Sequence, residues 1–339
     1  MKQKNYIRIS SEKYLKNDLT LFKHDLKDPD NEDIEISKEI IEFQKKIGDI
    51  DMGGAWKFYN ENTRTNYVKA LKEENTKVLA YQLCNMFQTE CTSAIITPSI
   101  NVSKNHDLLS QMAWDLDACS EFTRNKYDLK ILDAGNIGTP FGTIRDSIEI
   151  LPDSPRHLYF ADLISSHINN NDKILEVGGG YGGLIYFLRK IDFKGTYYNI
   201  DLPETLFVSY YYLRKSGHKV NLIYKKQDIK LNEVNLIPSM YFEKITKNLE
   251  YSVFFNSASL SEMDEKVCFN YIEMVNKTNP NYIIHCNSNY LAFPDSKIHI
   301  EILAKNFPWS ENFNLKSFYL SPFQGASGRY RIHIYENTL

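Results

Sequence analysis

The sequence lacks several features that mark other classes of protein. It has no apolar run long enough to span a membrane, and its first residues form no apolar signal segment. Its five cysteines are scattered, without the spacing of a metal site or a disulfide framework. Acidic and basic residues nearly balance, with a formal net charge of -3, so bulk charge predicts no nucleic-acid binding. We therefore expect a cytoplasmic protein with reduced thiols, no metal ion and no nucleic-acid partner.

The most informative segment of the chain is the glycine-rich stretch 174–184, ILEVGGGYGGL. It combines an apolar run typical of a buried strand, a turn made of glycines, and the first residues of a helix. Glycines let the backbone turn tightly and approach a ligand, and the N-terminus of the following helix points at whatever the turn binds. This order of elements predicts a nucleotide-cofactor site.

Two kinds of cofactor compete for this segment. Gly178, Gly180 and Gly183 match the GxGxxG pattern of dinucleotide sites, and Asp201 follows at the expected spacing of about 20 residues. Glu176 favours a different cofactor, because a carboxylate beside the turn would repel a pyrophosphate. S-adenosylmethionine has no phosphate, and its ammonium group suits a carboxylate partner. We therefore predict S-adenosylmethionine, with a dinucleotide and a purely structural turn as the alternatives.

Later strands supply the other predicted cofactor contacts. The segment 195–201 reads as a second strand ending in Asp201, which is placed to bind ribose hydroxyls and also to cap the next helix. A third strand, 220–224, precedes Asp228, which either contacts the adenine amino group or lies in a surface loop. The predicted cofactor-binding residues are Glu176, Gly178, Gly180, Tyr181, Gly182, Asp201, Leu202, Asp228, Ile229 and Asn256.

Three residues are candidates for the base that deprotonates an acceptor hydroxyl. Glu262 follows the fourth expected strand, 251–255, and His285 ends the fifth, 282–286. His157 precedes the glycine-rich segment by one helix. Carboxylate and imidazole groups both suit this proton transfer. The alternatives are a substrate-binding or helix-capping role for Glu262 and a structural role for each histidine.

The pattern of elements divides the chain at about residue 150. Apolar periodicity predicts helices at 35–47, 66–87 and 108–127, so we expect 1–150 to be a mainly helical region with a substrate, lid or oligomerisation role. From 151 to 339 strands alternate with helices, which predicts an α/β domain with a mostly parallel sheet covered by helices on both faces.

The strands 317–320 and 330–335 are expected to close the sheet as an antiparallel pair, and 231–249 is expected to be helix or loop. A homo-oligomer is compatible with the sequence.

The E-x-G-x-G-x-G order of the glycine-rich segment resembles motif I of class I methyltransferases. From about residue 135 onward the chain resembles a group of bacterial sugar O-methyltransferases. The segments that carry this resemblance are 135–142, 156–162, motif I, 199–204, 259–263 and 287–289. The His-Asp-Trp run that supplies the base in plant-type O-methyltransferases has no counterpart here.

The resemblance implies the Rossmann-like sheet of class I methyltransferases and S-adenosylmethionine as cofactor. It also implies a sugar, nucleotide-sugar or glycan hydroxyl as acceptor, in the biosynthesis of surface polysaccharide. The alternatives are methylation of another small acceptor, such as a phenol, an amine or a phosphoramidate, and a non-catalytic cofactor-binding partner protein.

Overall fold

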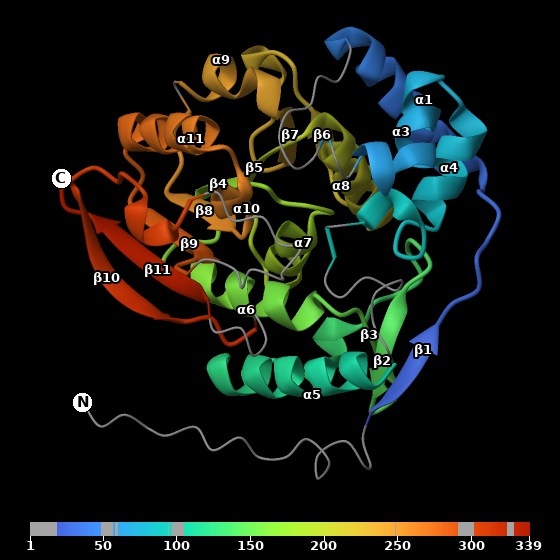
Figure 1. Cartoon of the computed structure of the whole chain (residues 1–339), viewed down its shortest axis with the longest axis horizontal. Coiled ribbons are helices and arrows are strands. Elements are labelled where there is room, and N and C mark those ends of the chain that lie inside the picture. The colour runs from blue at the N-terminus through green and yellow to red at the C-terminus, as the bar shows by residue number, and fades with distance from the viewer. Residues whose placement is uncertain are drawn as a thin grey trace.

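The structure is a computed structural model that describes residues 19–48, 57, 60–93, 95–96, 105–247, 249–290, 302–323 and 329–339. Its centre is an eight-stranded sheet with the strand order β10-β11-β9-β8-β4-β5-β7-β6, shown in Figure 1. The strands are β4 (Lys173–Val177), β5 (Thr196–Asp201), β6 (Val220–Leu222), β7 (Val234–Pro238), β8 (Val253–Ser257), β9 (Tyr282–Ser288), β10 (Phe313–Leu320) and β11 (Tyr330–Asn337).

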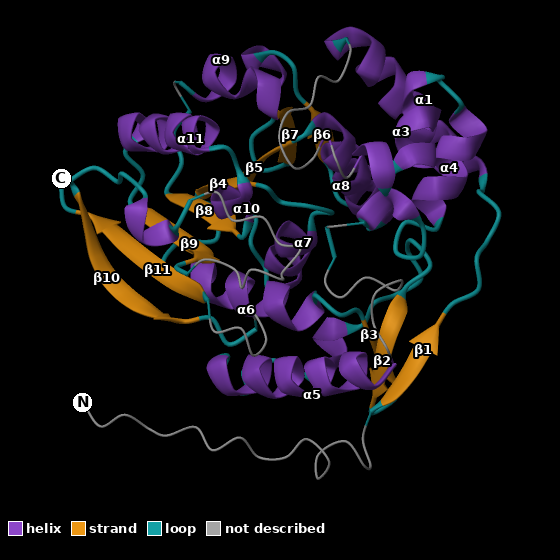
Figure 2. Ribbon diagram, in the orientation of Figure 1, coloured by secondary structure: helices purple, strands orange, loops and turns teal. Residues whose placement is uncertain are grey.

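Strands β4 to β9 pair in parallel, β11 runs antiparallel to β9, and β10 runs antiparallel to β11. Helices cover both faces, as Figure 2 shows in purple around the orange sheet. The predicted α/β class, a mostly parallel Rossmann-like sheet closed by an antiparallel pair, is confirmed. The helices of this region are α6 (Ser154–Ser165), α7 (Gly183–Lys190), α8 (Pro203–Lys215), α9 (Phe242–Thr246), α10 (Ser259–Glu262) and α11 (Glu265–Thr278).

Alternation along the strands divides the core between the two faces of the sheet. On β4, Ile174 belongs to the apolar cluster with residues of α6, α7 and α8, whereas the next residue, Leu175, belongs to the cluster with residues of α9 and α11. On β8, Phe255 and Phe254 divide in the same way. Successive side chains of a strand point to opposite faces, so strands buried on both sides are apolar at nearly every position.

Strand β7 was not predicted, and the expectation of helix or loop over 231–249 is wrong for residues 234–238. Asn235 interrupts the apolar run, yet it is fully buried, because its amide exchanges hydrogen bonds with the backbone of Lys230 at 2.8 Å. Since β7 pairs with β5 on one side and β6 on the other, it moves β6 to the edge of the sheet.

The N-terminal region contains a small sheet as well as the expected helices. Its helices are α1 (Asn31–Ile47), α3 (Thr65–Lys72), α4 (Thr76–Cys84) and α5 (Asn105–Phe122), and its antiparallel sheet is formed by β1 (Thr20–Lys23), β2 (Phe141–Arg145) and β3 (Ile148–Ile150). The expected helix 66–87 is broken between α3 and α4, where Glu74 adopts a φ of 56° and Asn75 caps α4. The sheet was missed because β1 pairs with β2 across more than a hundred residues.

Five short 3-10 turns complete the described elements, and they are η2 (Glu90–Thr92), η3 (Leu129–Leu132), η4 (Lys226–Asp228), η5 (Ser239–Tyr241) and η6 (Ala304–Asn306). All five cysteines are buried and carry free thiols. Among the described residues, no helix is both long enough and apolar enough to cross a bilayer.

Packing is continuous across residue 150. Figure 1 shows α1, α3 and α4 beside α8, and one apolar cluster contains residues of all four helices. Lys215 at the end of α8 forms ion pairs of 2.9–3.1 Å with Asp30, Glu32 and Asp33 at the start of α1. The N-terminal region therefore shares a core with the sheet domain and holds the helix that follows β5.

Candidate functional site

The segment between β4 and α7 forms the tight turn that its glycines predict. Gly178 and Gly180 adopt φ angles of 78° and 57°, a conformation that favours glycine. A Cβ atom on Gly178 would lie 2.2 Å from Oγ of Ser259, and one on Gly179 would lie 2.5 Å from Oε2 of Glu176. The turn therefore packs its backbone directly against side chains of β4 and α10.

Two carboxyl groups lie beside this turn, on neighbouring parallel strands. Glu176 is 3% exposed and accepts a hydrogen bond of 2.5 Å from the hydroxyl of Tyr197. Asp201, at the end of β5, accepts hydrogen bonds from the backbone N–H groups of Gly180 at 3.0 Å and Leu202 at 2.8 Å. Asp201 thus fixes the backbone of the turn, and Glu176 packs against it.

Loss of water raises the pKa of both carboxyl groups. Burial raises the pKa of Glu176 to about 8, although the hydrogen bond from Tyr197 lowers it in part. Burial also raises the pKa of Asp201 to about 7, although its two backbone hydrogen bonds lower it in part. The charge of Asp201 raises the pKa of Glu176 further. A cation bound in the turn would favour the charged form of both carboxylates, so the turn is suited to a ligand with a positive group.

Asn199 on β5 is a further residue that contacts the turn, and it was not among the predicted site residues. Its side chain is fully buried, its Oδ1 accepts a hydrogen bond of 3.2 Å from the N–H of Gly179, and its Nδ2 has no hydrogen-bond partner among the described residues. Asn199 lies two residues before Asp201 on β5, so both side chains point to the same face of the sheet. That spacing was the signal available in the sequence.

Asn256 lies at the junction of three strands. Its Nδ2 donates to the carbonyl of Val177 at 2.8 Å and to Oγ of Ser259 at 2.5 Å, and its Oδ1 accepts from Nδ2 of Asn287 at 2.7 Å. These partners come from β4, α10 and β9. Asn256 is fully buried, and its hydrogen bonds connect the ends of β4, β8 and β9 next to the turn.

The structure does not bring Asp228 together with Glu176 and Asp201, because the inserted β7 separates β6 from β5. Asp201 is opposite Pro238 of β7 instead.

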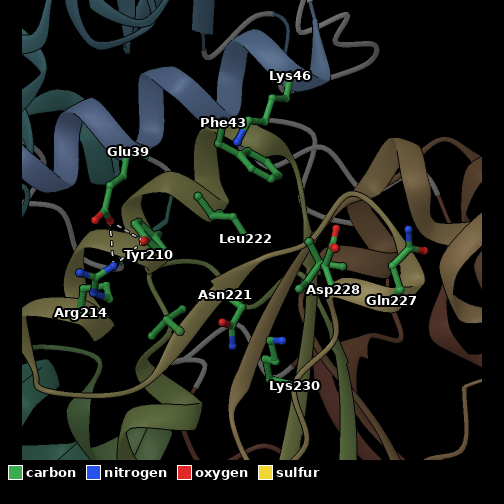
Figure 3. A pocket seen from close by; sticks show the side chains of 12 residues that line it. Glu39, Phe43, Lys46, Tyr210, Arg214, Asn221, Leu222, Gln227, Asp228 and Lys230 are labelled. Atoms are coloured by element: carbon green, nitrogen blue, oxygen red, sulfur yellow. Dashed lines mark hydrogen bonds and ion pairs between the residues drawn. The ribbon is translucent and has the colours of Figure 1, made fainter.

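Asp228 lines a different pocket of about 500 Å³ between the β6 edge and helices α1 and α8, where Phe43 and Arg214 also lie, as Figure 3 shows. Ile229 packs against the apolar cluster under α9 and α11. The residues next to Asp201 are those that follow β7, at 239–241.

The rings of Tyr181 and His157 form a stacked pair next to the turn. Their rings stack with centroids 5.3 Å apart and an angle of 16°, and Tyr181 is only 2% exposed, with its ring edge-on to Phe87. Tyr181 therefore has only its backbone to offer a cofactor. The neighbouring Gly182 has a φ of 89° and precedes the first residue of α7, Gly183.

His157 touches the start of α7. A Cβ atom on Gly183 would lie 1.9 Å from Nδ1 of His157, which has no hydrogen-bond partner among the described residues. Burial, reinforced by the charge of Arg156, holds the pKa of His157 well below its usual value. Both effects favour the neutral form of the imidazole.

His285 does not lie at the end of its strand, contrary to the sequence expectation. Strand β9 continues to Ser288, and this leaves His285 in the middle of the sheet, fully buried and stacked on His333 at 4.4 Å. Burial holds the pKa of His285 well below its usual value, and the neighbouring His333 lowers it further. Its Nδ1 lies 3.5 Å from Nδ2 of Asn287, which also donates to Asn256, so His285 lies two strands away from Val177, the last residue before the turn.

Glu262 ends α10, the short helix that follows β8 at the carboxyl edge of the sheet. Burial raises its pKa to about 7, opposed by the charge of Arg329. No hydrogen bond or ion pair to this carboxylate occurs within the described part of the chain. Of the three predicted candidates, Glu262 is thus the one whose pKa lies near neutrality and whose acid group is not engaged by the protein.

Helix α5 contributes an acid that the sequence analysis missed. Asp115 is 3% exposed, and burial raises its pKa to about 8. It lies within electrostatic reach of Asp153 and Arg156, which form an ion pair of 3.0 Å at the start of α6. Asp115 follows Met112 by three residues on the buried side of α5, and a carboxylate at a core position of an amphipathic helix is the signal that indicates it.

Within the described ranges, no group of three or more His, Cys, Asp or Glu side chains has an arrangement that could hold a metal ion. The site offers carboxylates, amides and guanidinium groups.

No protein-family model matches the sequence, and no curated protein matches it significantly. Similar solved structures include the PH0226 protein from Pyrococcus horikoshii OT3, with 11% identity over 55% of this chain and 91% of that chain and a TM-score of 0.37. Another is M. capricolum TrmK in complex with S-adenosylhomocysteine, with 14% identity over 52% and 67% and a TM-score of 0.36. A mutant of MtNAS shows 10% identity over 91% and 98%, with a TM-score of 0.38. These similarities are too remote to transfer a ligand or an activity.

The raised pKa of Glu176 predicts how stability depends on pH. Between pH 4.5 and 8 the folded protein keeps a proton that the unfolded chain has lost, so the free energy of unfolding falls as the pH rises. We expect Glu176→Gln to flatten this slope, measured by urea unfolding at pH 5 and pH 8. The exposed Glu121→Gln serves as the control and keeps the wild-type slope. An unchanged slope in Glu176→Gln would contradict the burial of an ionisable group here.

Proposed function

We propose that the protein is an S-adenosylmethionine-dependent methyltransferase that acts on a sugar hydroxyl. The observation that carries this proposal is the pair of carboxyl groups, Glu176 and Asp201, beside the glycine turn at the ends of β4 and β5. In open α/β sheets ligands bind at the carboxyl ends of the strands, where this turn lies.

The position of Glu176 favours S-adenosylmethionine over a dinucleotide. Its carboxylate lies directly under the backbone of Gly179, where a dinucleotide would place its pyrophosphate. A second acid, Asp201, lies beside it, and an ammonium group would favour the charged form of both carboxyls and be attracted by them, whereas a phosphate gains no such attraction. In our proposal Glu176 receives the ammonium group, directly or through water, and Asp201 exchanges its bonds to Gly180 and Leu202 for bonds to the ribose hydroxyls.

S-adenosylmethionine, when bound, supplies a methyl group on a positively charged sulfur, and transfer to an oxygen leaves the neutral thioether S-adenosylhomocysteine. The chain's part is to orient the acceptor and to take the proton of its hydroxyl as the oxygen–carbon bond forms. We assign the removal of this proton to Glu262, because its carboxylate has no hydrogen bond or ion pair among the described residues and its pKa of about 7 lies near the operating pH. His157 suits the task less well, because burial beside Arg156 disfavours its protonated form.

Unsatisfied polar atoms support a sugar as the acceptor. Oγ of Ser257, Oγ of Ser261 and Oδ1 of Asn289 are buried at the ends of β8 and β9 without a hydrogen-bond partner among the described residues. Leaving such atoms unpaired is costly, and an acceptor with several hydroxyls would satisfy them. A phenol or an amine offers fewer such groups. A role in surface polysaccharide biosynthesis follows only from the sequence resemblance and belongs to the same proposal.

Ligand binding tests the cofactor. Saturation at about 100 times the dissociation constant stabilises a fold by about 2.7 kcal/mol. We expect S-adenosylmethionine and S-adenosylhomocysteine to raise the melting temperature by several degrees and NAD to leave it unchanged. Glu176→Gln and Asp201→Asn are each expected to lose at least tenfold in affinity, whereas Glu121→Gln keeps it. A shift with NAD alone would overturn the assignment.

Turnover tests the base. With S-adenosylmethionine and a panel of sugars, we expect Glu262→Gln to lower kcat by about 10²- to 10⁴-fold while the affinity for the cofactor is retained. Because Glu262 must be ionised to act as the base, wild-type kcat should rise with pH up to about 7 and then level off. In Glu262→Gln this rise of kcat with pH should be absent. His157→Asn is the comparison. If it abolishes turnover and Glu262→Gln does not, the base is misassigned.

A further inference from the structure

We propose that Arg329 binds an anionic group, a phosphate or a carboxylate, on the acceptor of the methyl transfer. The inference deepens the proposed function and rests on it. It names the chemical class of the acceptor, a sugar that carries a negative charge near the hydroxyl to be methylated.

Arg329 lies at the edge of the sheet where the acceptor is expected. It immediately precedes β11, which runs antiparallel to β9, so the start of β11 meets the end of β9. The carbonyl of Arg329 accepts a hydrogen bond of 2.8 Å from the N–H of Asn289. Glu262 is close enough for the charge of Arg329 to lower its pKa. The guanidinium and the proposed base therefore belong to one site.

Arg329 is a buried residue that forms no ion pair with the other described residues. The residue is 9% exposed, and its Nε has no hydrogen-bond partner in that part of the chain. No carboxylate of the described ranges lies within the 4.0 Å of an ion pair to Arg329. A buried charge without such a partner is unfavourable in the free protein. The centroid of the Tyr330 ring lies 5.3 Å from Cζ of Arg329, so the ring covers one face of the guanidinium. The ring does not cover the N–H donors along the edge of the guanidinium plane.

Arg156 provides the contrast within the same site. It is also largely buried, but its Nη2 lies 3.0 Å from Oδ1 of Asp153, so its charge is balanced. Among the described residues, Glu262 and Asp115 are the other acids in electrostatic contact with these two arginines, and burial raises their pKa values to about 7 and about 8. At neutral pH these two groups supply less than two full negative charges. These described acids therefore leave the positive charge of Arg329 only partly balanced.

The geometry of the guanidinium indicates the type of group it would bind. Its N–H donors form a fork that matches the two oxygens of a carboxylate or a phosphate. An anion held there would place a hydroxyl of the same molecule beside Glu262, where its proton can be removed. An uncharged sugar would leave the buried guanidinium unpaired, so the site would discriminate against it.

Binding of small probes to the full chain, saturated with S-adenosylhomocysteine, tests the inference without turnover. The probes are glucose, glucose 1-phosphate, glucuronate and inorganic phosphate, measured by calorimetry. We expect glucose 1-phosphate or glucuronate to bind at least tenfold more tightly than glucose, and the better of the two identifies phosphate or carboxylate as the natural group. Arg329→Gln should reduce this preference at least tenfold, and Arg329→Lys should retain part of it.

Two controls separate this role from a structural one. Arg331→Gln, two residues further along β11, keeps the preference, because its guanidinium lies over the Tyr290 ring. Arg329→Gln should leave the melting temperature of the free protein unchanged or raised, since it removes a buried charge that lacks a counter-ion.

Equal binding of glucose and its charged derivatives, or an unchanged preference in Arg329→Gln, would overturn the inference. If S-adenosylhomocysteine itself fails to bind, the proposed function fails instead, and the two failures are therefore distinguishable.

Discussion

The site depends on one constraint, a carboxyl group buried beneath a turn that consists almost entirely of glycine. Glu176 lies so close to Gly179 that any Cβ atom there would collide with it. Because Glu176 lies so close to the turn, its carboxyl group can interact electrostatically with a ligand that the turn binds. Tyr197 and Asn199 from the neighbouring strand hold the carboxyl and the turn in place. Burial favours the neutral form of Glu176 in the free protein, and a bound cation would favour the charged form, so the ligand and the charge state of the site are coupled.

The N-terminal region completes this site rather than simply covering it. The hydroxyl of Tyr67 on α3 donates to the carbonyl of Glu204 at 2.7 Å, and Arg64 lies fully buried beside it. Glu204 belongs to the first turn of α8, three residues after Asp201, so α3 fixes the segment that positions the proposed ribose-binding acid. On the side proposed for the acceptor, α5 brings Asp115 within electrostatic reach of the Asp153–Arg156 pair. The parts of the site that we propose for the cofactor and for the acceptor are therefore both in contact with residues before 150.

The sequence predicted the parts of the site that are local and missed those that depend on long-range packing. Glu176, the glycines and Asp201 follow from spacing within one strand–turn–helix unit and the next strand, and the structure places them together. Strand β7 was missed because an asparagine at a core position argues against a buried strand. In the structure the amide of Asn235 can be buried, because it forms hydrogen bonds with the backbone of Lys230. His285 was misplaced because β9 runs two residues beyond the predicted strand. Arg329 follows no motif, and its burial depends on the antiparallel return of β11 beside β9.

A crystal structure of the chain with S-adenosylhomocysteine tests the central claim most directly. The account predicts the amino group of the ligand on the Glu176 side of the glycine turn, directly or through one water, and its ribose hydroxyls on Asp201. The adenine should lie near 239–241, after β7. A ligand bound instead in the pocket between β6 and α1, or a turn that keeps its bonds to Asp201 with no ligand at saturating concentration, would contradict it.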